Sequence, residues 1–214
     1  MGGGVVQVRI SGPVPDGLTI FETLRMEPDG SVRLWPLHVA RLQSGCAAVG
    51  FPLDEAKLDL SHLPRGKALR VRMAVDMGGG VQFSHAELPP NPPFWMVALS
   101  GRVESDDPWL RIKSSRRAVY DRARAGLPDG VDEAILTNER GEICEGSITN
   151  LFLQMGGRLL TPPLSSGLLP GVLRQSLLQA GDVEEAVLRP DELRRGEIWM
   201  GNALRGLIPA RLIP

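Results

Sequence analysis

Residues that build metal centres and disulfide frameworks are scarce in this 214-residue sequence. Only two cysteines, Cys46 and Cys144, and three histidines occur, and none of them falls in a CxxC, Cys/His or HExxH spacing. The GxSxG sequence of a nucleophile elbow is also missing. The composition therefore gives no reason to expect a disulfide framework, a metal site, a metalloprotease or an α/β-hydrolase.

Long apolar segments and an excess of one charge are likewise missing. No run of about 18 apolar residues occurs, and the N-terminus lacks the pattern of a signal peptide, so we expect a cytoplasmic protein. The formal net charge is −1. Such a balance gives no reason to expect a nucleic acid or an anionic membrane as a partner.

Lysine is rare enough to make one of its three occurrences informative. The chain has 24 lysines and arginines together, of which only three are lysine. Lys113 precedes an expected helix whose N-cap would be Ser114 or Ser115. Two neighbouring arginines, Arg116 and Arg117, make this turn electropositive, which lowers the pKa of an amine and favours its neutral, nucleophilic form. The alternative is an ordinary solvated lysine in a basic turn.

The first half of the chain predicts a small α/β unit. Its length, its 43% hydrophobic content and its 23% charged content suit a soluble globular protein of one large or two small domains. Proline-rich residues 88–93 and polar residues 100–108 are the best linkers, so we expect two domains, 1–100 and 101–214. The elements expected before the boundary are strands over 17–26, 31–35, 67–77, 80–87 and 95–99 and a helix over 37–49 that ends at Gly50.

The second half predicts two hairpins and a loop that leads into a helix. Segments 134–137 and 142–144 flank a turn, as do 150–154 and 158–161, and a glycine-bearing loop at 165–171 precedes a helix over 172–180. A glycine-bearing loop at a helix start exposes backbone N–H groups at the positive end of the helix dipole, which suits a phosphate, although most such turns bind nothing.

Two charged residues stand where charge is unusual. Glu145 falls at a strand end among small and apolar neighbours, where a carboxylate needs a cationic or N–H partner unless it reaches solvent. Arg41 falls on a mostly apolar helical stripe, where a buried guanidinium needs an anionic partner. The alternative for Arg41 is a position at the edge of the stripe, with its head group in water.

Taken together, six segments resemble the class IV fold of pyridoxal-phosphate enzymes, which includes branched-chain and D-amino acid aminotransferases and 4-amino-4-deoxychorismate lyases. They follow the order of the family and extend from about residue 17 to the end of the chain. They are FETLR (21–25), HVARLQS (38–44), IKSSRR (112–117), DEAILTNERGEICEGSITNLF (132–152), LLTPPLSSGLLPGVLR (159–174) and EIWMGNALRGLIPA (197–210).

The resemblance implies a role for each of the three unusual charges. Lys113 matches the lysine that forms a Schiff base with the aldehyde of pyridoxal 5'-phosphate. Glu145 matches the acid that keeps the pyridine nitrogen protonated, so that the ring serves as an electron sink. Arg41 matches the arginine that binds the cofactor phosphate.

Two backbone turns complete the implied cofactor site. Val172 and Leu173 match the helix start that cradles the phosphate, and Asn202 and Ala203 match a second turn that reaches the same phosphate. Members of the family often have a hydroxyl residue at the position of Ala203, so only a backbone N–H contact is expected there.

The implied architecture is a two-domain α/β (α+β) enzyme of fold type IV, with mixed or antiparallel sheets, flanking helices and the cofactor between the domains. The family also implies a homodimer and a small-molecule amino substrate. The local motifs resemble the lyases most, and we expect cleavage of 4-amino-4-deoxychorismate to 4-aminobenzoate and pyruvate. Arg25 and Arg117 are candidates for binding the substrate carboxylates. The alternatives are an aminotransferase that acts on branched-chain or D-amino acids, and a non-catalytic cofactor-binding protein.

Overall fold

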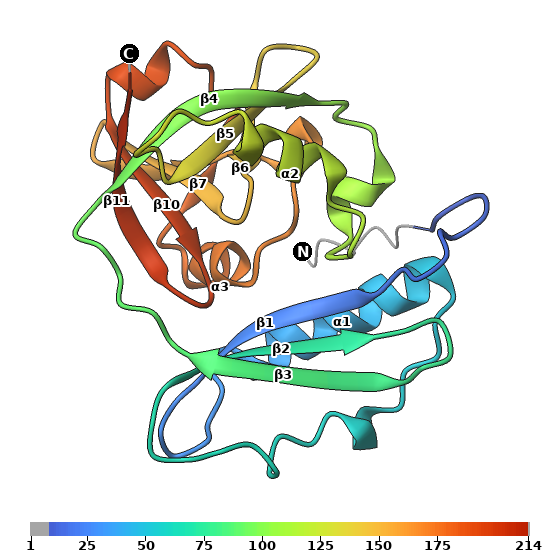
Figure 1. Ribbon diagram of the computed structural model, residues 1–214. Helices are drawn as coiled ribbons and strands as arrows, with labels where there is room; N and C mark the ends of the chain where they lie inside the picture. The colour runs from blue at the N-terminus through green and yellow to red at the C-terminus, as the bar shows by residue number, and fades with distance from the viewer. Residues whose placement is uncertain (1–8, 214) are drawn as a thin grey trace.

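Two β-sheets with helices packed beside them make up the chain (Figure 1). The computed structural model describes residues 9–213. A three-stranded sheet has the order β1-β2-β3, and an eight-stranded sheet has the order β6-β5-β4-β11-β10-β7-β8-β9. The smaller sheet and α1 lie at one end of the molecule, and the larger sheet lies at the other. The predicted α/β architecture with mixed sheets is confirmed.

Strands that are consecutive in the sequence often pair with each other in a sheet, as β1 does with β2 and β7 with β8. The strands are β1 (Ile20–Met26), β2 (Leu69–Val75), β3 (Val81–Glu87), β4 (Trp95–Val103), β5 (Glu133–Asn138), β6 (Ile143–Gly146), β7 (Asn150–Met155), β8 (Arg158–Thr161), β9 (Glu184–Glu185), β10 (Glu197–Asn202) and β11 (Gly206–Leu212). The helices are α1 (Trp35–Val49), α2 (Ala118–Ala125) and α3 (Val172–Ala180), with short 3-10 turns η1 (Glu55–Lys57), η2 (Pro108–Arg111), η3 (Leu164–Ser166) and η4 (Glu192–Arg194).

The small sheet is antiparallel and packs one face on α1. Alternate residues of β1 point to that side, and Ile20 and Leu24 are buried there with Leu42 of α1. The other face is turned away from this core and bears the aromatic ring of Phe21 together with polar side chains such as Thr23 and Arg72. The helix has a proline in its first turn and ends at Gly50, whose φ of 74° is a left-handed value that glycine accepts without strain. The predicted helix over 37–49 is therefore confirmed, with an earlier start.

The large sheet is mixed and contains both predicted hairpins. β5 pairs with β6 and β7 pairs with β8, in each case antiparallel. β4 pairs in parallel with β5 and with β11, so the strand expected at 95–99 belongs to this sheet. The chain passes from one sheet to the other in residues 88–94, because β4, which begins at Trp95, already belongs to the large sheet. The domain boundary expected near residue 100 stays a prediction.

The segment around Lys113 joins the two sheets. Phe21 donates its backbone N–H to the Lys113 carbonyl, and the Ser115 N–H donates to the Thr19 carbonyl, each at 2.9 Å. These bonds place residues 113–115 alongside β1, although η2 and α2 on either side of them belong with the large sheet. The lysine is thereby fixed between the two parts of the molecule.

The helix after Lys113 differs from its predicted start. It begins at Ala118, and neither Ser114 nor Ser115 is its N-cap. The Ser115 hydroxyl instead accepts a hydrogen bond from the Thr19 N–H at 3.0 Å. Pairing with β1 keeps the serines extended, so the helix starts later. Within residues 9–213, none of the helices has the length and apolar character needed to cross a bilayer.

Candidate functional site

A cavity of about 310 Å³ is lined by residues from both sheets and from the segment that joins them. Most of the residues singled out from the sequence share this one cavity. They are Arg41, Lys113, Arg117, Glu145, Val172, Asn202 and Ala203.

Two of the singled-out residues are placed differently. Arg25 lies outside the lining and forms an ion pair with Glu27, with Nε 2.8 Å from Oε1. Leu173 also lies outside the lining, although its backbone belongs to the first turn of α3. The structure therefore brings seven of the nine residues together around one space.

Lys113 is half-buried in this cavity beside an aromatic ring. Its Nζ lies 4.9 Å from the centre of the Phe21 ring. Burial lowers the pKa of the Lys113 amine to about 8, and the positive charge of Arg41 adds to the effect, with a smaller contribution from Arg117. The sequence indicated the direction of this shift, but burial and not the adjacent arginines is its main cause.

Glu145, in β6, is buried among neutral hydrogen-bond donors. The Tyr120 hydroxyl donates to its Oε1 at 2.7 Å, and the Leu169 N–H donates to the same oxygen at 3.1 Å. Burial raises the pKa of the Glu145 carboxyl to about 8, against the hydrogen bonds from Tyr120 and Leu169, which favour the ionised form. Burial and the charge of Glu145 also raise the pKa of Tyr120. A carboxyl in this state readily shares a proton with a basic ligand atom.

Arg41 obtains its anionic partner from the protein itself. Its Nε and Nη2 donate to the two carboxylate oxygens of Glu22 at 2.7 and 2.6 Å, and His38 Nδ1 lies 2.7 Å from Glu22 Oε2. Burial by itself would raise the pKa of Glu22, but the charge and hydrogen bonds of Arg41, together with His38, lower it to about 2. The guanidinium is thus held in one orientation by a bidentate ion pair.

The N-terminus of α3 meets this group of charges. Arg41 Nη1 donates to the Pro170 carbonyl at 3.2 Å, immediately before the helix. The N-cap, Gly171, supplies no side-chain acceptor to the first N–H groups. His38 Nε2 is buried and has no hydrogen-bond partner among the described residues. Free helix N–H groups beside a fixed guanidinium suit a phosphate.

Gly171 is required by a close approach. A Cβ atom at this position would lie 1.7 Å from Asn150 Oδ1. The amide of Asn150 donates to the Leu169 carbonyl at 3.1 Å and lies 3.4 Å from Glu145 Oε2. Asn150 therefore connects the acid at one end of the cavity to the turn that leads into α3.

Glu133 organises the loop that forms another wall. Its carboxylate accepts hydrogen bonds from the Ser147 and Ile148 N–H groups at 3.0 and 3.1 Å and from the Thr149 hydroxyl at 2.9 Å. It also lies 3.2 Å from Arg124 Nη1. The buried acid at the start of β5 thus fixes residues 147–149, which line the cavity.

Asn202 shapes the second turn. Its Oδ1 accepts from the N–H groups of Leu204 and Arg205 at 3.1 and 2.9 Å, and its Nδ2 donates to the Ile148 carbonyl at 3.2 Å. The Asn202 side chain is therefore occupied by the protein, and Ala203 brings no hydroxyl. Only backbone groups of this turn remain for a ligand.

The sequence interpretation missed several residues of the site. Glu22, His38, Tyr120, Glu133 and Asn150 were given no role. A partial signal existed for the first two, because Glu22 alternates with apolar residues that face the core and His38 lies one helical turn before Arg41. The hydrogen bonds from Tyr120 and to Glu133 join distant segments, for which the sequence has no local signal.

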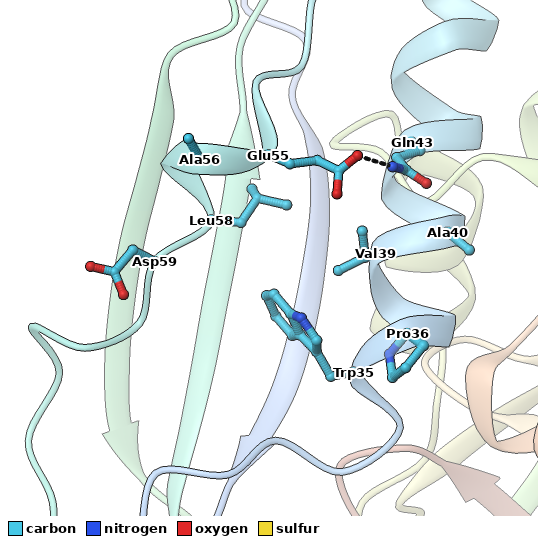
Figure 2. Close-up of a pocket in the computed structure, with 9 residues that line it drawn as sticks. All are labelled: Trp35, Pro36, Val39, Ala40, Gln43, Glu55, Ala56, Leu58 and Asp59. Carbon is cyan, nitrogen blue, oxygen red and sulfur yellow. Dashed lines mark hydrogen bonds between the residues drawn. The ribbon is translucent and has the colours of Figure 1, made fainter.

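A second, larger hollow of about 580 Å³ lies between α1 and η1 (Figure 2). Trp35 and Val39 of α1 border it, and Gln43 donates to Glu55 across it at 2.6 Å. Its lining contains acidic side chains but no lysine, arginine or histidine. An anionic ligand has no counter-charge there, so the cavity at Lys113 is the candidate active site.

Comparisons with known proteins agree with the fold and the motifs. The family described as Amino-transferase class IV matches residues 19–213. The aminodeoxychorismate lyase of Bacillus subtilis is 28% identical over 90% of this chain and 76% of its own length. A Thermotoga maritima protein named "Probable branched-chain-amino-acid aminotransferase" is 36% identical, but over only 50% of this chain and 40% of its own length.

A solved structure extends the likeness over nearly the whole chain. The crystal structure titled "Putative amino-acid aminotransferase" from Mesorhizobium loti has a TM-score of 0.85 and 39% identity, and covers 92% of this chain and 100% of its own. With the family match over residues 19–213, the chain belongs to the class IV aminotransferase and aminodeoxychorismate lyase family of fold-type-IV enzymes that use pyridoxal phosphate.

Proposed function

We propose that this protein is a lyase that splits 4-amino-4-deoxychorismate into 4-aminobenzoate and pyruvate. The observation that carries the proposal is that Lys113, Glu145 and Arg41 line one cavity whose lining is rich in arginine. A lysine, an acid and an anion site suit the cofactor, and the arginines suit a substrate with two carboxylates.

The residues present fit pyridoxal phosphate at three points. Arg41 and the N-terminus of α3 would hold the phosphate, since they combine a fixed guanidinium with free N–H groups. Glu145 would face the ring nitrogen, and Lys113 would hold the aldehyde carbon. The second turn, at Asn202 and Ala203, would add a backbone contact to the phosphate.

When bound, the cofactor supplies an electron sink for the carbon that bears the substrate nitrogen. Glu145 would share with the ring nitrogen the proton that burial otherwise keeps on its own carboxyl. Lys113 has a pKa of about 8, so a useful fraction of its amine is neutral near neutral pH and accepts a proton at Nζ. General acid–base catalysis of this kind is typically worth about 10²–10⁴-fold in rate.

The proposed reaction balances without a second substrate. Lys113 Nζ removes the proton from the ring carbon that bears the nitrogen, and the C–O bond to the enolpyruvyl group breaks as the ring becomes aromatic. The enolate leaves with the bond electrons and becomes pyruvate when it is protonated. Lys113 holds the proton removed in the first step and can return it.

An aminotransferase is the alternative function, and the family contains both activities. A branched-chain substrate would need an apolar pocket for its side chain, whereas the lining of this cavity contains six arginines: Arg41, Arg70, Arg72, Arg116, Arg117 and Arg205. This difference favours the lyase over a branched-chain aminotransferase. The Mesorhizobium loti structure is named as an aminotransferase, so an amino acid must also be tested as a substrate.

The deciding experiment offers both substrates to purified protein loaded with pyridoxal phosphate. We expect 4-aminobenzoate from 4-amino-4-deoxychorismate and no glutamate from 2-oxoglutarate with branched-chain or D-amino acids. Glutamate formation without 4-aminobenzoate would establish the aminotransferase. A protein that takes up pyridoxal phosphate, seen from its absorbance spectrum, but forms neither product would be the non-catalytic alternative.

The assignment of Lys113 is tested separately. Borohydride reduction followed by peptide mass spectrometry should locate the cofactor on Lys113, and Lys113→Ala should lose both the label and turnover. Lys67→Ala, at an exposed position outside the cavity, is the matched control and should keep both. A label on another residue would contradict the assignment.

A homodimer is part of the proposal, because the family resemblance implies one. Light scattering after size-exclusion chromatography should give about twice the chain mass of 23.2 kDa. A monomer with full activity would contradict it.

A further inference from the structure

We propose that two arginines of β2, Arg72 and Arg70, together with Arg117, bind the two carboxylates of the substrate. The inference rests on the proposed function, because it names the groups that would recognise a dianionic substrate at the same site. It replaces Arg25, which the sequence suggested for this role, with two arginines from the neighbouring strand.

The strand register places these side chains at the cavity. β1 and β2 are antiparallel neighbours, with Thr23 opposite Arg72 and Arg25 opposite Arg70. Paired residues share a face of the sheet, and this face is opposite the one that packs on α1. Arg70, Arg72 and Thr23 line the cavity, whereas Arg25, one step further along β1, does not.

Arg72 is positioned close to the reacting amine. Its Cζ lies 3.5 Å from the centre of the Phe21 ring, and Lys113 Nζ lies 4.9 Å from the same centre. A guanidinium that rests on an aromatic ring is held in place and keeps its N–H edges free for an anion. One substrate could therefore contact both Arg72 and Lys113.

Within residues 9–213, Arg70 and Arg72 have no carboxylate within ion-pair distance. The other arginines nearby differ: Arg25 pairs with Glu27 at 2.8 Å, and Arg116 pairs with Asp107 at 3.3 Å. Burial lowers the pKa of Arg72, and the positive charge of Arg117 lowers it further. Arg117 has only a long ion pair, with Asp121 at 3.8 Å, so the two neighbouring guanidinium groups favour an anionic ligand.

The lining of the cavity carries almost no negative charge of its own. Of the residues that line it, Glu145 is the only acid, and its raised pKa leaves it largely neutral at neutral pH. Arg41 is already neutralised by Glu22. The remaining positive charge lies at Lys113 and at Arg70, Arg72, Arg117 and Arg205, of which Arg117 is partly balanced by Asp121 at 3.8 Å. A ligand with a single carboxylate would neutralise only part of this charge.

The exposure of the three arginines indicates which substrate carboxylate each of them would bind. Arg72 and Arg117 are partly buried, whereas Arg70 is exposed. Arg117 Nη2 already donates to the Ser147 carbonyl at 2.8 Å, which fixes its orientation. We assign the carboxylate nearer to the reacting carbon to Arg72 and Arg117, and the outer carboxylate to Arg70.

The first test separates binding from turnover in steady-state kinetics. Arg72→Gln should raise KM for 4-amino-4-deoxychorismate about 10–100-fold, as expected for loss of a hydrogen-bonded charge pair, and should change kcat much less. Arg72→Lys should recover part of the loss because it restores the charge without the planar fork. Arg70→Gln should raise KM by a smaller factor.

Two control arginines calibrate these values. Arg158→Gln, in an exposed ion pair with Glu184 on the large sheet, should leave KM unchanged. Arg25→Gln should raise KM less than Arg72→Gln, because Arg25 lies outside the cavity. An Arg25→Gln effect as large as that of Arg72→Gln would overturn the assignment, and so would unchanged KM in both Arg72→Gln and Arg70→Gln.

The second test needs no turnover. Calorimetric titration of the holoenzyme with chorismate, which has the same two carboxylates and a hydroxyl in place of the amine, should show binding that weakens about 10–100-fold in Arg72→Gln. Benzoate, with one carboxylate, should bind more weakly than chorismate to the unchanged protein. Equal chorismate affinity in Arg72→Gln and the unchanged protein would overturn the inference.

The two proposals fail in different ways. If no 4-aminobenzoate forms but chorismate binding still depends on Arg72, the lyase is wrong and the dianion site stands. If 4-aminobenzoate forms and Arg72→Gln changes neither KM nor chorismate affinity, the lyase stands and the dianion site is wrong. If Arg72→Gln does not fold, as judged by circular dichroism, the exposed Arg70→Gln decides the outcome.

Discussion

Glu145, which lines the cavity, and Glu22, which holds the cavity residue Arg41, are two buried carboxylates with opposite protonation behaviour. Glu22 meets two nitrogens of Arg41 and one of His38, and its pKa falls to about 2. Glu145 meets a tyrosine hydroxyl, a backbone N–H and, at 3.4 Å, an amide, and its pKa rises to about 8. Depth of burial is similar, so the partners make the difference.

Glu22 has a cationic partner within the protein, whereas Glu145 has only neutral donors and needs a cationic atom from a ligand. At Glu22 the counter-charge is built in, so this acid fixes Arg41 in place for an anion. At Glu145 the donors are neutral, so a buried negative charge remains unfavourable until a cationic ligand atom lies beside it. The first acid is therefore structural support and the second is a binding group.

Removal of the first acid should have the largest effect on stability. Glu22→Gln leaves Arg41 buried without its ion-pair partner, which typically costs about 3–5 kcal/mol. Urea unfolding monitored by circular dichroism measures the loss. Glu87→Gln, which breaks the exposed pair with Lys67, is the control and should have no measurable effect. Equal stabilities of the two variants would contradict the supporting role of Glu22.

Removal of the second acid should act on activity instead. Glu145→Gln keeps the size of the side chain but removes its charge, and loss of one such electrostatic group typically lowers kcat about 10²–10³-fold. We expect the unfolding free energy of the cofactor-free variant to stay equal or to rise, because the folded state no longer has to keep a proton on a carboxyl that ionises in the unfolded chain. A variant with full kcat would show that Glu145 does not hold the ring nitrogen.

The two acids should give opposite slopes of stability with pH. Glu22 has a folded pKa of about 2 against 4.5 as its ordinary value, so its contribution is complete above pH 4.5 and is lost as pH falls through about 2. Glu145 has a folded pKa of about 8, so the folded state keeps a proton that the unfolded state releases, and stability falls as pH rises from 4.5 to 8.

Urea unfolding of cofactor-free protein across this range measures both slopes. Glu145→Gln should flatten the decline between pH 4.5 and 8, and Glu22→Gln should reduce the loss below pH 4.5. The Lys113 amine, with its pKa lowered to about 8, changes stability only above that pH and leaves the window clear. An unchanged decline in Glu145→Gln would mean that another group causes it.

The smallest expected effect is a shift in the pKa of Glu145 when its hydrogen bond from Tyr120 is removed. Tyr120→Phe removes the 2.7 Å hydrogen bond to its carboxylate but leaves the ring. Loss of this bond should raise the pKa of Glu145 further, by about one unit, which corresponds to about 1.4 kcal/mol. Carboxyl ¹³C NMR of the cofactor-free protein follows this titration. A pKa that falls in Tyr120→Phe would contradict the donor role of Tyr120.

Local patterns in the sequence predicted the elements that local physics determines. The glycine-bearing turns placed both hairpins of the large sheet, and Gly50 and Gly181 marked the ends of α1 and α3. An isolated lysine, a strand-end acid and an arginine on an apolar stripe each indicated chemistry. The family resemblance then joined them into one expected site.

Contacts between distant segments could not be read from the sequence. The sequence did not show that Glu22, nineteen positions before Arg41 in the chain, forms its ion pair. It also did not show that β4 belongs to the large sheet, because a short apolar strand carries no mark of its partner. The start of α2 was missed because Ser114 and Ser115 pair with β1, a tertiary contact that overrides their preference for helix caps.

The backbone bonds between residues 113–115 and β1 have a further consequence for the small sheet. β1 is an outer strand in the order β1-β2-β3, and these bonds cover part of its free edge. An uncovered edge offers its N–H and C=O groups to strands of other molecules. The same short segment that carries the reactive amine thus also protects the protein against edge-to-edge aggregation.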